Sequence, residues 1–171
     1  MVVNTTTRST INRMEPIKEV LLEKEYDTPL SKVWQAWTTA EELKEWWGPD
    51  NVTIPECTID LKVGGSFYIV MEAGEAMGPY KGTLWPMQAT FTVVVPESHL
   101  SYSAQAWTEG MKEDTTIDQT TDITFSEING KTKVTVKAAI YKTGPKAGMA
   151  AEGMQMGFTQ QLAKLNVYLC K

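Results

Sequence analysis

A chain of 171 residues with a formal charge of −5 has the size of a single domain and the wrong charge for a duplex nucleic-acid partner. Phosphate contacts need clustered Lys and Arg, whereas the basic residues here are interleaved with acidic ones. The same charge disfavours binding to an anionic membrane surface, and no run approaches the roughly 18 apolar residues of a membrane span. We therefore expect no nucleic-acid partner and no stable membrane insertion.

The two cysteines, Cys57 and Cys170, lie far apart in the sequence and fit neither a C-x-x-C pair nor a dense disulfide framework. We interpret both as free thiols in a reducing compartment. The N-terminus carries polar residues from Thr5 to Arg8, where a signal peptide would have its apolar core. These features together predict a cytoplasmic protein.

The domain organisation is simple. Residues 1–15 are rich in Thr and Asn and show no apolar periodicity, so we expect a flexible N-terminal tail. No internal repeat or second domain is visible in residues 16–171. We predict one domain over that range, large enough to bury roughly 70% of the surface that its unfolded chain would expose.

The first structured segment alternates apolar and acidic residues, which predicts a strand over Lys18–Tyr26. The periodicity then changes at Thr28, which can cap a helix, and Pro29, which can take its first position. Apolar residues recur at helical spacing from there to Thr38, so we predict a short helix.

A second short helix follows directly. Thr39 and Glu42 have the S/T-x-x-E spacing of a capping box, and the Gly48-Pro49 pair ends the helix. Two adjacent tryptophans on so short a helix are not expected to face the same core. We therefore expect either Trp46 or Trp47 to line a cavity mouth or to meet solvent.

The middle of the chain alternates apolar and polar residues in segments separated by turn residues. The predicted strands are Cys57–Leu61, Ser66–Glu72, Tyr80–Val95 with a break at Pro86, Leu100–Trp107, Thr116–Phe125 and Lys133–Tyr141. The apolar side chains share one parity within each strand, which gives the sheet one dry face. That face needs a cover.

A helix predicted over residues 150–169 provides the cover. Its apolar side chains fall on one stripe, at Met154, Phe158, Leu162, Leu165 and Leu169. Consecutive strands that end in one long helix predict an α+β protein in which a sheet packs on a helix.

A set of ordered motifs adds a family resemblance. The motifs are Tyr26-Asp27-Thr28-Pro29, Val33-Trp34 with Ala36-Trp37, Trp46-Trp47-Gly48-Pro49, Cys57 to Gly65, Lys81-Gly82-Thr83, and Glu152-Gly153-Met154 through Gly157-Phe158 to Leu162. They resemble the homologues of the activator of the ninety-kilodalton heat-shock chaperone's ATPase, within the START-like or SRPBCC superfamily. The resemblance covers about Val20 to Leu169.

This resemblance implies the birch-pollen-allergen-like helix-grip fold. In that fold a curved antiparallel sheet of about six or seven strands wraps around a long C-terminal helix, with two short helices after the first strand. The chain departs from the family at Lys62, where Arg is usual, and at Phe158, where Trp is usual. The segment from Leu84 to Val95 looks about six residues longer than usual, and the sequence leaves its role open.

Gly153 and Gly157 lie one turn apart inside the predicted final helix, where each costs about 1 kcal/mol relative to Ala. A close approach of the helix to a strand would explain them, and so would space left for a bound molecule. Five methionines could likewise form adaptable cavity walls or fill the core. They are Met71, Met77, Met149, Met154 and Met156.

Signals of catalysis are scarce. His99 is the single histidine and lies in a Pro-Glu-Ser-His turn, so we expect it to be exposed and to build neither a triad nor a metal site. The sequence contains no P-loop and no G-x-G-x-x-G motif after a strand. We predict no cofactor, no metal site and no catalytic residue, and we interpret Asp60 and Lys62 as a structural ion pair.

The leading hypothesis is non-catalytic binding of a small hydrophobic or amphipathic ligand between the sheet and the final helix. The candidate ligand-binding residues, chosen from strand parity and position, are Trp47, Phe67, Met71, Tyr80, Trp85, Tyr102, Trp107, Met154 and Phe158. We expect the protein to be a monomer or a weak homodimer.

Two alternatives stay open. The resemblance suggests a co-chaperone that binds a heat-shock chaperone and activates its ATPase in the stress response, although this chain lacks room for the separate N-terminal domain of eukaryotic activators. The superfamily also contains cyclase or aromatase enzymes, which would need Tyr and carboxylate side chains to position a hydrophobic substrate.

Overall fold

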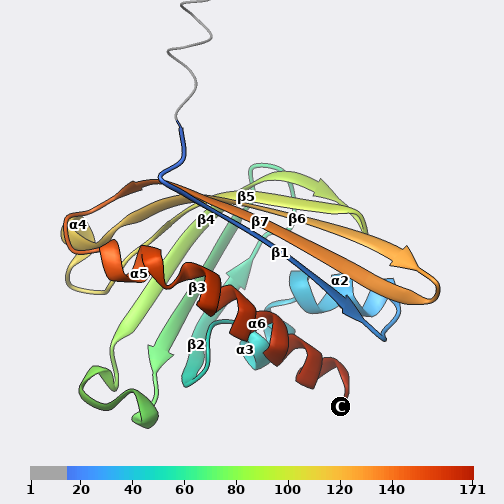
Figure 1. The fold of residues 1–171 in the computed structure, drawn as a ribbon, viewed down its shortest axis with the longest axis horizontal. Coiled ribbons are helices and arrows are strands. Elements are labelled where there is room, and N and C mark those ends of the chain that lie inside the picture. Colours follow the sequence, from blue (N-terminus) through green and yellow to red (C-terminus); the bar gives the residue numbers. More distant parts are fainter. Residues whose placement is uncertain (1–14) are drawn as a thin grey trace, which may run out of the picture.

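The computed structural model describes residues 15–171 as a curved, seven-stranded antiparallel sheet with helices on its concave side (Figure 1). The strand order is β1-β7-β6-β5-β4-β3-β2, so the first strand pairs with the last and the others follow the chain. The predicted α+β helix-grip fold is confirmed. The flexible tail predicted for residues 1–15 falls almost wholly outside the described residues.

The strands are β1 (Lys18–Tyr26), β2 (Val52–Ile59), β3 (Ser66–Ala73), β4 (Leu84–Val95), β5 (His99–Ala106), β6 (Ile117–Ile128) and β7 (Lys131–Thr143). The helices are α2 (Leu30–Thr38), α3 (Ala40–Trp46), α4 (Lys112–Thr115), α5 (Gly148–Glu152) and α6 (Met154–Leu169), with a 3-10 helix, η1, over Glu75–Tyr80. Within residues 15–171, no helix combines the length and apolarity needed to cross a bilayer.

Alternation along the strands gives the sheet one dry face, which α6 covers. In β7, Val134, Val136 and Ala138 are fully buried, whereas Lys137 between them is exposed. Figure 1 shows α5 and α6 running together beneath this concave face. The Tyr26 hydroxyl at the end of β1 donates a hydrogen bond of 2.9 Å to the carbonyl of Leu162, which ties the sheet to α6.

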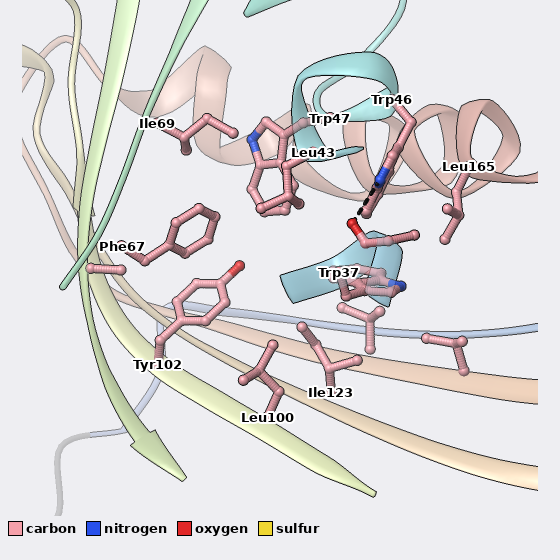
Figure 2. Close-up of a cluster of buried hydrophobic side chains, with 14 of the residues drawn as sticks. Trp37, Leu43, Trp46, Trp47, Phe67, Ile69, Leu100, Tyr102, Ile123 and Leu165 are labelled. Carbon is pink, nitrogen blue, oxygen red and sulfur yellow. Dashed lines mark hydrogen bonds between the residues drawn. The ribbon is translucent and has the colours of Figure 1, made fainter. Parts of the chain in front are cut away.

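Both adjacent tryptophans are buried in one core, so the expectation that they could not share it is wrong, although Trp47 also lines a cavity, as was expected of one of the two. Trp46 is 0% exposed and Trp47 is 6% exposed, and their ring centroids are 5.8 Å apart (Figure 2). The reason is that α3 ends at Trp46, while Trp47 is extended (φ −63°, ψ 148°), so its side chain leaves the helical direction. The Trp46 Nε1 group also donates to the carbonyl of Ala36 at 3.1 Å.

β2 is longer than predicted, because it begins at Val52 rather than at Cys57. A register shift between Thr53 and Glu56, around Pro55, interrupts the alternation that would have revealed it. Since β2 lies at the edge of the sheet, the missing N–H of a proline is tolerated there.

The predicted break at Pro86 is also wrong, since β4 runs through it without interruption. The carbonyl of Pro86 accepts a hydrogen bond of 3.1 Å from the Trp107 N–H, so the ring nitrogen of Pro86 faces the same side of β4 as this carbonyl. On that side β5 has already ended at Ala106, so the sheet does not need an N–H donor from Pro86. The strand starts at Leu84 because Tyr80 belongs to η1. The lengthened segment from Leu84 to Val95 is therefore one long strand.

Neither predicted helix cap is formed by a side chain. No side-chain hydrogen bond caps α2 or α3, although Thr39 does take the N-cap position of α3. The Glu42 carboxylate instead accepts a 2.8 Å hydrogen bond from the Tyr168 hydroxyl of α6. The carbonyl of Thr28 accepts one of 2.7 Å from the buried Thr132 hydroxyl. Glu42 and Thr28 thus bond to other elements of the fold and not to the first turn of a helix.

The final helix is not continuous, because Gly153 separates α5 from α6 with φ −79° and ψ −3°. The predicted stripe survives in the second part, where Leu162 and Leu165 are buried and Met154, Phe158 and Leu169 are partly buried.

We expect Tyr26→Phe to lower the free energy of unfolding by about 1 kcal/mol, because it removes the buried bond between β1 and the Leu162 carbonyl. Urea denaturation measures the change. Tyr80→Phe, at an exposed hydroxyl, is the matched control and should change stability by less than about 0.5 kcal/mol. Equal effects of the two variants would contradict this role of Tyr26.

Candidate functional site

A cavity of about 340 Å³ lies between the concave face of the sheet and the helices α5 and α6. One wall comes from β3, β4 and β5, and the facing wall comes from the N-terminal half of α6 and from α5. The volume falls at the lower end of the range of roughly 300–1,000 Å³ that small-molecule sites occupy. The site therefore suits a compact molecule rather than a long chain.

Seven of the nine predicted residues line this cavity. They are Trp47, Met71, Trp85, Tyr102, Trp107, Met154 and Phe158. They come from the turn after α3, from three strands or their ends, and from α6, so the fold brings together side chains that are more than a hundred residues apart. Aromatic rings thus form much of the wall.

Phe67 and Tyr80 do not line the cavity. Phe67 is buried behind it, where its ring lies 5.5 Å from the rings of both Trp47 and Tyr102 and stacks on Phe91 at 5.9 Å (Figure 2). Tyr80 is 59% exposed in η1, so the strand parity used to place it does not apply. Phe67 supports the cavity wall from behind, and Tyr80 faces solvent.

The five methionines divide into two groups. Met71, Met77 and Met154 line the cavity, whereas Met149 and Met156 are exposed on the outer side of α5 and α6. The unbranched thioether can adjust to ligands of different outline, so the first group gives the wall some adaptability.

Both glycines of the final helices also line the cavity, and close packing explains neither. A Cβ at Gly157 would meet nothing within 4 Å, and one at Gly153 would meet only the carbonyl oxygens of Met149 and Ala150, at 3.4 and 3.8 Å. The explanation by close approach to a strand is wrong. The missing side chains leave open space in the cavity wall.

Sequence reasoning missed two amide side chains in the lining, Gln119 and Gln161. Gln161 is buried although it is polar, and it lies between Phe158 and Leu162 on the buried side of α6. A glutamine four residues after Gly157, on the same helix face, was the available signal. Met77 lies in η1, and no periodic pattern predicted its position.

The turn after α3 is hydrogen-bonded to α6 at four points. Gln161 Oε1 accepts the Gly48 N–H at 3.0 Å, and Gln160 Oε1 accepts the Asp50 N–H at 3.0 Å. Lys164 Nζ donates to the carbonyls of Trp47 and Pro49, at 3.1 and 3.2 Å. We call these contacts the turn clamp. They fix Trp47 at the inner end of the cavity.

Gly48 is required in the turn clamp because its φ is +85° and because it has no room for a side chain. A Cβ there would lie 2.8 Å from Met71 Sδ and 2.8 Å from Val52 Cγ2. Burial lowers the pKa of Lys164, partly offset by the charge of Asp50. The lysine satisfies the carbonyl of Trp47, the C-cap residue of α3, and that of Pro49 in the turn that follows.

The titratable side chains in the lining are Tyr102 and Lys146. Tyr102 is fully buried, and burial raises the pKa of its hydroxyl, so it stays neutral. Lys146 lies at the rim, where its side chain is 63% exposed and its Nζ is 3.6 Å from the Asp114 carboxylate. Among the described residues, the wall thus provides neither a carboxylate nor an imidazole for moving a proton.

The outer rim is formed by the segment that follows β5. The Trp107 ring lies under Lys112 Nζ, which is 4.2 Å from the ring centroid. The Thr108 N–H donates to Thr115 Oγ1 at 2.9 Å, which ties the end of β5 to α4. These contacts order the rim around Trp107.

His99 is half-buried at the start of β5, so the prediction of an exposed histidine in a turn is wrong. Its Nε2 lies 2.5 Å from Asp122 Oδ1 and 3.1 Å from Ser101 Oγ, and Ser101 also donates to Asp122. A triad uses both imidazole nitrogens to link Ser to Asp, whereas one nitrogen meets both groups here. The cluster is on the opposite face of the sheet from Tyr102.

Asp122 holds this cluster together electrostatically. Burial alone would raise the pKa of its carboxyl, but hydrogen bonds from Ser101 and His99 and the charge of Lys137 lower that pKa overall. The predicted ion pair of Asp60 and Lys62 is present at 3.5 Å and is exposed. Both clusters lie outside the cavity lining, so we assign them to structure.

Cys57 and Cys170 are free, as predicted, but they differ in environment. Cys57 is buried, and burial raises its pKa to about 11, with smaller opposing effects of Lys44 and Glu41. A thiol with so high a pKa is a poor nucleophile near neutral pH. Cys170 is exposed beyond the end of α6.

Comparison with known proteins gives one family. A family model described as "Activator of Hsp90 ATPase homolog 1-like protein" matches residues 27–170, from the end of β1 to the residue after α6. No curated protein matches the chain significantly.

Solved structures share the fold. A crystal structure of a Nitrosomonas europaea protein is 25% identical, with a TM-score of 0.69 over 88% of this chain and 93% of the other. A Mycobacterium smegmatis protein is 21% identical, with a TM-score of 0.70 over 88% and 90%. An Arthrobacter aurescens protein solved by NMR is 20% identical, with a TM-score of 0.70 over 89% and 86%.

We expect one fast-reacting thiol per folded chain at pH 8 in a disulfide-exchange assay, and two after unfolding, because the raised pKa keeps Cys57 protonated. Cys170→Ser should leave the folded protein almost unreactive. Two equally fast thiols in the folded wild type would contradict this assignment.

The buried neutral thiol of Cys57 also stabilises the fold below pH 9, and this contribution to stability should be lost as the pH rises through about 11.

Proposed function

Because the chain belongs to the Activator of Hsp90 ATPase homolog 1-like family and keeps an open cavity inside its fold, we propose that it binds a small hydrophobic or amphipathic molecule without changing it chemically. The ligand would lie between the sheet and α6. Trp47 and Tyr102 would contact its inner part, and Trp107 its outer part.

The observation that carries this proposal is the open space at Gly157. A glycine inside a helix costs about 1 kcal/mol relative to Ala, and here no neighbouring atom requires it. Gly153 also lines the cavity, at the break between α5 and α6. A glycine inside a helix, such as Gly157, that reduces helix stability and enlarges a cavity is expected where the cavity is used.

The chemistry of the wall favours binding over catalysis. Apolar and aromatic side chains dominate the lining, with two amides and the neutral Tyr102 hydroxyl as its inner polar groups. A cyclase or aromatase mechanism would require a carboxylate beside the substrate, and the wall built from the described residues offers none. The cavity's composition gives that alternative no support.

A co-chaperone function is the second candidate, because the matching family is described by its likeness to an activator of the Hsp90 ATPase. Activation would require a surface that recognises the chaperone. The features described above concern an internal cavity instead, and this ranks ligand binding first.

Gly157→Phe should weaken ligand binding, because the Phe ring would occupy the open space in the cavity wall beside residue 157. We expect the affinity for the neutral fluorophore N-phenyl-1-naphthylamine to fall at least ten-fold, which corresponds to about 1.4 kcal/mol. The thermal midpoint should stay the same or rise, since Phe has a higher helix propensity than Gly. Fluorescence titration and thermal melting measure the two effects.

Ala163→Phe is the matched control, since residue 163 is an exposed position of α6 outside the cavity lining. It should bind the fluorophore like the wild type. The proposal fails if the wild type shows no saturable binding to N-phenyl-1-naphthylamine, or if both variants bind it equally.

We expect the ATPase rate of the Hsp90-type chaperone from the same organism to be unchanged by a saturating amount of this protein. A coupled ATPase assay gives the rate, with the chaperone alone as the control. A several-fold increase that persists in Gly157→Phe would favour the co-chaperone function, because it would show that activation does not depend on the cavity.

A further inference from the structure

Gln161 is the buried polar side chain of the cavity wall. It is only 5% exposed, and it continues the line of Gly153 and Gly157 at intervals of four residues along α6. Residues at this spacing lie on one helix face. The two glycines and the amide therefore form one continuous strip of the wall.

The orientation of the Gln161 amide follows from its partner. The Gly48 backbone N–H is a donor and lies 3.0 Å away, so the oxygen of the amide must face it. The Nε2 group is then on the other side of the planar amide. Within residues 15–171, Nε2 is buried and has no hydrogen-bond partner. An unpaired buried donor is destabilising.

Gly157 and Gln161 line the same cavity, one helical turn apart. Side chains on a helix lean toward its N-terminus, so the side chain of residue 161 leans toward the turn that contains residue 157. A Cβ at Gly157 would have no neighbour within 4 Å. The two costly features, an unneeded glycine and an unpaired donor, thus belong to the same wall.

Gln119, the other amide of the lining, differs from Gln161. Its Nε2 faces the Met87 thioether at 3.7 Å, which is a weak acceptor but still a partner. Of the two amides, Gln161 is therefore the one whose Nε2 group has no partner within residues 15–171.

The charges around the cavity decide which acceptor fits. Lys164 is occupied by the carbonyls of Trp47 and Pro49, and Lys146 lies at the exposed rim beside Asp114. No ammonium group of the described residues faces the inner wall, so a carboxylate placed there would be desolvated without a counter-charge. A neutral oxygen acceptor avoids that cost.

We propose that the ligand is a compact aromatic molecule with a neutral carbonyl group, and that this carbonyl accepts a hydrogen bond from Gln161 Nε2. The aromatic part packs against Trp47, Tyr102 and Phe158, and the carbonyl lies beside Gly157. The cavity of about 340 Å³ limits the ligand to a few fused rings. This inference rests on the proposed ligand binding and specifies its chemistry.

The test uses two probes of the same shape, 2-acetylnaphthalene and 2-isopropenylnaphthalene, in which C=CH₂ replaces C=O. Their affinities are measured by competition with N-phenyl-1-naphthylamine. The ratio of the two affinities is compared between the wild type and Gln161→Met, which removes the amide and keeps the length of the side chain. We expect the ratio to shift by about five-fold against the ketone in Gln161→Met.

Gln160→Met is the matched control. Gln160 makes the same kind of bond to the turn clamp, at 3.0 Å to the Asp50 N–H, but it does not line the cavity. Its probe ratio should equal that of the wild type. The infrared carbonyl stretch of bound, isotope-labelled 2-acetylnaphthalene gives a second readout, and its frequency should be lower in the wild type than in Gln161→Met.

The outcomes separate the two levels of the argument. An equal probe ratio in Gln161→Met and the wild type overturns the hydrogen bond and leaves ligand binding intact. If Gln161→Met does not fold, a carbonyl stretch at the hydrogen-bond-free frequency in the wild type overturns it equally. Binding of 2-naphthoate as tight as that of the ketone overturns the neutral acceptor. Failure of every probe to bind the wild type overturns the proposed function itself.

Discussion

The turn clamp is the contact on which the rest of the cavity depends. A sheet and a helix can pack in many relative positions, and hydrophobic burial alone does not select one of them. Hydrogen bonds are directional, and Gln161 and Lys164 make theirs to backbone groups of the turn between Trp47 and Asp50. They fix the rotation of α6, and that rotation decides which of its residues face the sheet.

The tryptophan pair converts this fixed turn into a boundary between core and cavity. Trp46 packs at 4.7 Å against Trp37 in the closed part of the core, while the extended backbone at the next residue directs Trp47 toward Phe67 and the cavity (Figure 2). A helix one residue longer would have turned Trp47 away from this position. The end of α3 at Trp46 is therefore as important for the cavity as the aromatic rings themselves.

Much of the fold follows from the sequence, because periodicity and ordered motifs both depend on which face of each element is buried. The bounds of β1 agree with the prediction to the residue, and α2 begins one residue later than predicted, with Pro29 as its N-cap. The errors at Val52 and Pro86 arise where a bulge or a strand end hides the alternation. In the site, parity brought Met71, Trp85 and Tyr102 to the cavity wall, but Phe67 lies behind the wall and Tyr80 is not in a strand. Gln161 was missed because its partner, Gly48, is distant in sequence.

The hydrogen bonds between α6 and the rest of the protein are unevenly distributed along it. Those that side chains make across the interface involve residues 160–168, from Gln160 to the Tyr168 hydroxyl on Glu42. Within residues 15–171, the preceding part, which roofs the cavity, has a single such bond, from Lys18 to the carbonyl of Glu152 in α5. Local opening is easiest where few contacts must break. The N-terminal part of α6 should therefore open locally at a lower free-energy cost than residues 160–168, which hold the helix to the rest of the domain.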